Sequence, residues 1–71
     1  MLKKEQKLDI IGNRIIIIEG TIYNLELAIQ EEEAKSIPSE SYIQELNFLK
    51  SENLMSLEAM NNQLEIVSVE Q

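Results

Sequence analysis

Carboxylates are the side chains of this sequence with the clearest capacity for chemistry, since 13 of its 71 residues are Asp or Glu. Several glutamates recur every seven residues, and clusters of carboxylates in helix bundles can hold paired metal ions. Those sites also use a Glu-x-x-His element, and the sequence has no His. We therefore expect solvated flanks of a helix bundle rather than metal ligands. The recurring residues are Glu19, Glu26 and Glu33, Glu45 and Glu52, and Glu58 and Glu65.

Other reactive groups are absent from the sequence. It has no Cys and no His, which removes thiolate ligands, the commonest metal ligand and the commonest general base. It also lacks a glycine-rich phosphate loop and any zinc-binding spacing. We predict no catalytic residue, no metal site and no cofactor, and therefore a protein that is not an enzyme.

The densest run of charge is Glu31 to Glu33. Consecutive residues of a helix point in different directions, so these three carboxylates cannot converge on one cation. Negative charge is also unfavourable near a helix C-terminus, and only Lys35 offsets it here. We predict a solvated face close to the end of a helix.

Two single polar residues could direct the pairing of helices. Arg14 could pair with Glu19 of a second copy if the first helices lay parallel, but we favour a solvated surface arginine. Asn53 lies within an apolar pattern, where an amide that requires a partner amide would fix the register of the helices. A solvated position at the edge of that pattern is an equal alternative for Asn53.

The charge of the chain limits its partners. Its net charge of −7 disfavours binding to nucleic acid and to anionic membrane surfaces. The longest apolar run, Ile15 to Ile18, is far too short to span a membrane, and the N-terminal residues do not form a signal peptide. We expect a soluble, intracellular protein.

The strongest structural signal is a stripe of Ile and Leu spaced alternately by three and four residues. This spacing predicts one long helix over about residues 2–34 that packs against another helix. A β-hairpin turning at Glu19-Gly20 is the alternative, but the spacing continues across that turn. The first stripe consists of Leu8, Ile11, Ile15, Ile18, Ile22, Leu25 and Ile29.

A turn at about residues 35–39 separates this helix from a second one at about 39–67. Pro38 cannot continue a helix but suits the first turn of a new one, which either Ser36 or Ser39 could cap. The second stripe consists of Tyr42, Leu46, Leu49, Asn53, Leu57, Met60, Leu64 and Val67.

Two helices of similar length joined by a short turn predict an all-α fold. We expect residues 1–71 to form a single domain, a coiled-coil-like antiparallel hairpin. The first helix also carries a second apolar flank. A single neighbouring helix would not cover both the first stripe and this flank. Two hairpins packed as a dimeric four-helix bundle would bury it, at roughly 1.5–3 kcal/mol for each buried Ile or Leu. The second flank consists of Ile10, Ile16, Ile17 and Tyr23.

The segments Lys7 to Ile15 and Tyr23 to Leu27 resemble small coiled-coil proteins encoded by marine tailed phages. In those proteins a KLDII…RI…YNLEL run precedes an acidic helix end, a Ser/Pro turn and a second helix. The resemblance implies a phage protein of unassigned function, located in the host cytoplasm or the virion.

These patterns predict a helical protein that associates with itself, preferably as a dimer, and that would serve a phage as a small structural or accessory protein. The alternative is a regulatory binding module. In that case the hairpin would lay its exposed apolar face on a host or virion protein, as a helix docks in a groove.

Overall fold

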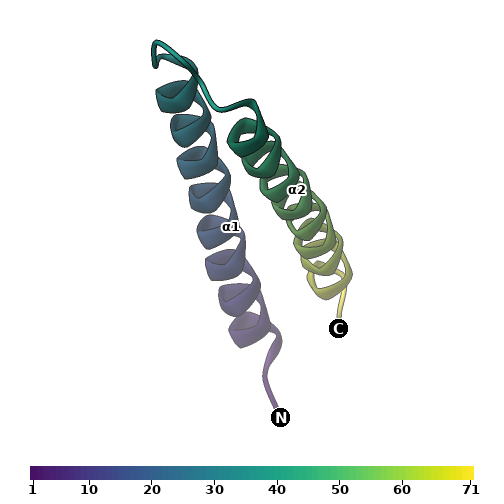
Figure 1. Cartoon of the computed structure of the whole chain (residues 1–71). Coiled ribbons are helices and arrows are strands. Elements are labelled where there is room, and N and C mark those ends of the chain that lie inside the picture. The colour runs from purple at the N-terminus through teal and green to yellow at the C-terminus, as the bar shows by residue number, and fades with distance from the viewer.

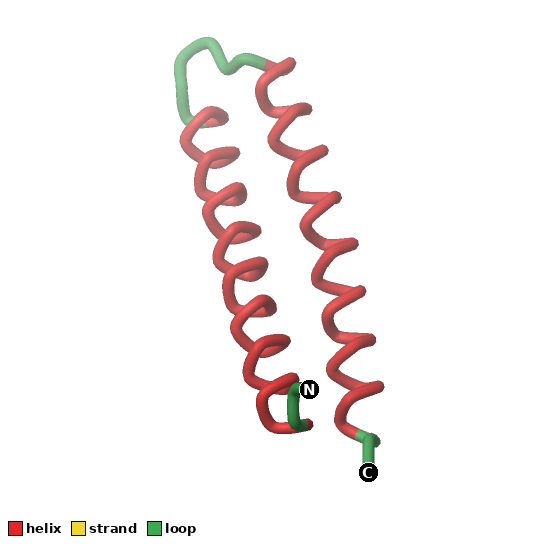
Figure 2. The backbone as a smooth tube through the Cα atoms, turned by 90° about the horizontal axis from the view of Figure 1, so that it is seen from below, coloured by secondary structure: helices red, strands yellow, loops and turns green.

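The computed structural model describes all 71 residues as two long antiparallel helices joined by a short turn (Figure 1). Helix α1 spans Lys4–Glu33 and helix α2 spans Glu40–Ser68. The helices lie side by side along their length, in a molecule of 56 × 16 × 14 Å (Figure 2). The predicted all-α helical hairpin is confirmed, and the alternative β-hairpin is wrong because residues 19 and 20 lie inside α1.

Helix α1 begins and ends with local hydrogen bonds. At its start the Gln6 side chain accepts a hydrogen bond from the Lys3 N–H at 2.9 Å. At its end the N–H groups of Ala34 and Lys35 donate to the carbonyls of Gln30 and Glu32. These contacts satisfy backbone groups that a helix end leaves without an intrahelical partner.

Helix α2 begins at a serine cap. The Ser39 hydroxyl accepts a hydrogen bond from the Tyr42 N–H at 3.3 Å, so Ser39 and not Ser36 is the capping residue. The expectation that Pro38 lies in the first turn of the helix is wrong. Pro38 precedes the cap, because Ser39 keeps the extended backbone of an N-cap residue and the helix starts only at Glu40.

The first stripe faces α2 along the whole of α1. All seven of its members are buried or half-buried, and Ile22 is the least exposed at 8%. Burial that follows a strict three–four alternation over three heptads has a period of about 3.5 residues. The two helices therefore pack in the manner of a coiled coil.

The second stripe departs from its prediction near the turn. Tyr42 and Leu49 are each 43% exposed, and Ile43 and Lys50 occupy the inward positions instead. Leu49 is predicted to face α1 because it is apolar. The strict three–four spacing of the positions that face α1 instead places Lys50 there. The Lys50 stem lies along the interface and its ammonium reaches Glu26, with 3.5 Å between nitrogen and oxygen.

The rest of the second stripe lies in the contact as predicted by its spacing. Leu46 and Val67 are each 5% exposed, and the other members are half-buried. Those half-buried members are Asn53, Leu57, Met60 and Leu64.

The interior between the two helices is thin. No side chain is fully buried, and the accessible surface is 5548 Å². A compact protein of 8.2 kDa is expected to expose about 4,500 Å². The hairpin therefore exposes about 1,000 Å² more than a compact fold of its mass would.

Candidate interaction surfaces

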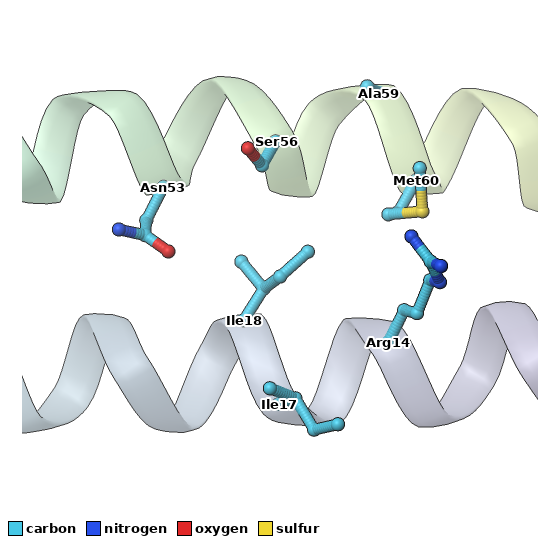
Figure 3. Close-up of a pocket in the computed structure, with 7 residues that line it drawn as sticks. All are labelled: Arg14, Ile17, Ile18, Asn53, Ser56, Ala59 and Met60. Carbon is cyan, nitrogen blue, oxygen red and sulfur yellow. The ribbon is translucent and has the colours of Figure 1, made fainter.

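The hairpin has two broad sides, and each carries a shallow groove between α1 and α2. The first, here the apolar groove, has a volume of about 360 Å³. Figure 3 shows Ile18 projecting from α1 into the space between the helices, with Arg14 extending toward Met60 of α2. The apolar groove is lined by Arg14, Ile17, Ile18, Asn53, Ser56, Ala59 and Met60.

The second groove lies nearer the turn and is mostly polar. Its volume is about 380 Å³, and the ion pair of Glu26 with Lys50 lies in it. We call it the polar groove. It is lined by Glu26, Ile29, Gln30, Glu33, Asn47 and Lys50.

Asn53 projects toward the apolar groove (Figure 3) but bonds within its own helix. Its side-chain nitrogen donates to the Leu49 carbonyl at 2.9 Å, and α1 offers it no partner amide. Asn53 therefore does not fix the register of the hairpin through an amide pair. A register role between two copies stays a prediction.

Arg14 is exposed and makes no ion pair within the chain, as expected of a surface arginine. Glu19 is likewise exposed and unpaired. Arg14 borders the apolar groove beside Met60 of α2, whereas Glu19 lines neither groove. Their pairing between two copies stays a prediction.

The second apolar flank of α1 is exposed, but it is two columns rather than one. Ile17 lines the apolar groove, and Ile10 lies seven residues before it on the same side. Tyr23 precedes Gln30 by one heptad and Ile16 precedes it by two, so both lie on the side of the polar groove. The prediction of a single flank is wrong because neighbouring helix residues point about 100° apart.

The glutamates of the seven-residue repeats do not converge. No three His, Cys, Asp or Glu side chains lie close enough together to hold a metal ion. Glu26 is half-buried beside Lys50, and the remaining members of the repeats are exposed.

Glu32 is the exception among the charged residues, because it is 6% exposed. One carboxylate oxygen accepts from the Lys35 ammonium at 3.0 Å, and the other accepts from the Ser39 N–H at 3.2 Å. The prediction of a solvated face is therefore wrong for Glu32, although Glu31 and Glu33 are exposed. Glu32 follows Ile29 by three residues and continues the first stripe, a signal that its charge obscured.

These contacts hold the pKa of Glu32 below its ordinary value of 4.5. The Lys35 hydrogen bond is the main cause and the Ser39 N–H adds to it, while removal from water opposes them. A carboxyl group whose pKa is lower in the folded state stabilises the fold above its unfolded pKa. That stabilisation is lost as the pH falls through the folded value.

We therefore expect Glu32→Gln to lower the melting temperature at neutral pH, and the deficit to shrink as the pH falls below 4.5. Thermal melts followed by circular dichroism from neutral to acid pH measure this. Glu33→Gln, on an exposed neighbour, is the control and should follow the wild type. A loss of melting temperature in Glu32→Gln that does not change with pH would contradict the lowered pKa of Glu32.

At the end of the hairpin away from the turn, two lysines of α1 contact the last residues of the chain. The Lys7 ammonium lies 3.2 Å from the Glu70 carboxylate, and the Lys4 ammonium donates to the Glu70 carbonyl at 3.0 Å. The Lys7 and Glu70 side chains are 36% and 37% exposed, so this pair contributes less than about 1 kcal/mol. Its effect is to hold the last residues of the chain against the start of α1.

Comparison with protein families, with curated proteins and with solved structures found no match to this chain. Neither helix contains a stretch long and apolar enough to cross a membrane. Any functional interpretation therefore depends on the chemistry of the hairpin's own surface.

Proposed function

We propose that this protein is a non-enzymatic helical association protein whose hairpin completes its apolar core by binding a second copy as a four-helix bundle. The observation that carries this proposal is the exposure of large apolar side chains on both helices. Five of them are at least 60% exposed within helices: Ile16, Ile17, Tyr23, Phe48 and Met55.

The size of the chain supports the same conclusion. A domain near 70 residues rarely gains more than about 3–5 kcal/mol from one hydrophobic core, and disulfides, metals or oligomerisation usually add to it. This chain has no cysteine and no cluster of metal ligands. Oligomerisation or docking on a partner protein remains, and we favour oligomerisation because large apolar side chains are exposed on both helices.

Solution mass measured by light scattering over a wide range of concentrations tests the proposal. We expect a dimer of twice the 8.2 kDa chain mass, with a melting temperature that rises with concentration. A mass of 8.2 kDa throughout, with a constant melting temperature, would overturn it. The exposed surface would then indicate docking on a different protein.

A further inference from the structure

We infer that two copies meet through the side of the hairpin that bears the apolar groove, and that the side bearing the polar groove stays in water. This inference rests on the proposed self-association and specifies its surface. It follows from the distribution of charge and of small residues over the two sides, and from the exposed area of the hairpin as a whole.

Negative charge is concentrated on the side of the polar groove. Along a coiled-coil helix, a residue lies on the same side as a residue seven positions away. It also lies close to a groove residue four positions before it. Lys50 is the only basic residue there, and Glu26 already pairs with it. Pressing two such surfaces together would juxtapose like charges, which costs several kcal/mol in general. Eight of the 13 acidic residues lie there: Glu5, Asp9, Glu19, Glu26, Glu33, Glu40, Glu58 and Glu65.

Charge is nearly balanced on the side of the apolar groove. Arg14 has no ion pair in its own chain, and neither do Glu45 and Glu52. A two-fold interface sets a surface against itself, so unpaired charges of both signs can find partners in the other copy. This side carries three basic and four acidic residues. They are Lys3, Lys7 and Arg14, and Glu31, Glu45, Glu52 and Glu70.

The shape of this side also suits a second helix pair. The middle of the groove is lined by the small side chains of Ser56 and Ala59, so it stays open between the helices. Larger apolar side chains are exposed along the same side of the two helices and would pack against a partner. They are Ile17 at 68% exposure, Ile66 at 55%, Ile10 at 45%, and Tyr42 and Leu49 at 43%.

The exposed area matches what a stable dimer needs. A specific interface of ordinary size covers about 800 Å² on each partner. The accessible surface of 5548 Å² exceeds that of a compact protein of this mass by about 1,000 Å². The area that one partner covers in such an interface is therefore of the same order as this excess.

Two adjacent isoleucines provide a matched test, because Ile16 and Ile17 are 67% and 68% exposed and lie on opposite sides. We expect Ile17→Glu to weaken the dimer at least about 100-fold, since a two-fold interface contains the change twice. Ile16→Glu should change the dissociation constant only a few-fold. Analytical ultracentrifugation gives both constants, and circular dichroism verifies that both variants remain helical.

The outcomes separate the surface from the self-association. A monomeric wild type would overturn the proposed function and this inference together. A dimeric wild type that dissociates with Ile16→Glu, or equally with both changes, would leave self-association standing and overturn the choice of surface. Dissociation with Ile17→Glu alone supports both.

Thiol labelling gives a second measurement that does not depend on weakening the dimer. The chain has no cysteine, so Ser56→Cys in the apolar groove and Ser51→Cys on the opposite side each introduce a single thiol. Both serines are exposed in the hairpin. We expect the Ser56→Cys thiol to react at least tenfold more slowly with a maleimide as concentration rises through the dissociation constant. Equal rates for the two thiols at high concentration would overturn the inference.

Discussion

Leu46→Ala is expected to unfold a large fraction of the protein at room temperature. Leu46 is 5% exposed at the inward position of α2, in a hairpin that has only three buried apolar side chains. Leucine-to-alanine changes at buried sites cost about 2–5 kcal/mol. That cost equals the entire contribution expected from the core of a domain this small, about 3–5 kcal/mol.

Urea titration followed by circular dichroism at one fixed protein concentration measures the effect, since self-association makes stability depend on concentration. Leu54→Ala is the matched control, because Leu54 is 47% exposed on the side of the polar groove. We expect it to cost less than about 1 kcal/mol. Similar losses for the two variants would show that Leu46 is not part of the core.

The double change Lys50→Leu with Asn53→Leu is expected to stabilise the hairpin by about 2–4 kcal/mol. Lys50 and Asn53 are successive half-buried inward positions of α2, so they leave a polar interval in an otherwise apolar stripe. The ion pair that would be lost is partly exposed, with Lys50 32% and Glu26 43% accessible. Such a pair contributes little, and Glu26 alone can be hydrated.

Chemical denaturation and light scattering on the same samples test this second change. A higher urea midpoint with an unchanged mass is the expected result. A mixture of masses would indicate that Asn53 fixes the pairing between copies, as a polar residue in a coiled-coil stripe can. A lower midpoint would contradict the expected gain, and each single variant would then show which polar residue stabilises the fold.

Much of this architecture is predictable from residue spacing alone. The Ile and Leu residues of the first stripe are large, apolar and regularly spaced, and Pro38 interrupts the helix in one place only. Hydrophobic burial and backbone sterics then lead to one solution. The second stripe was harder to predict because Leu49 and Lys50 are neighbours, and the inward position belongs to the charged one.

The surfaces are less predictable, because they depend on which polar groups find partners in three dimensions. Glu32 is indistinguishable from its glutamate neighbours by type, and its burial goes with hydrogen bonds from Lys35 and from the Ser39 N–H across the turn. Ile16 and Ile17 are likewise equivalent by composition. The position of α2 assigns them to opposite sides of the molecule.

The bond between Glu32 and Ser39 also has a consequence for the order in which the chain folds. It joins residues only seven apart, whereas Lys7 and Glu70 are 63 apart. Closing a loop of about ten residues takes roughly 10–100 ns, and later contacts then form across a loop that is already closed. We therefore expect helix pairing to spread from the turn toward the lysines, and fraying of the native state to begin at the lysines and to reach the turn last.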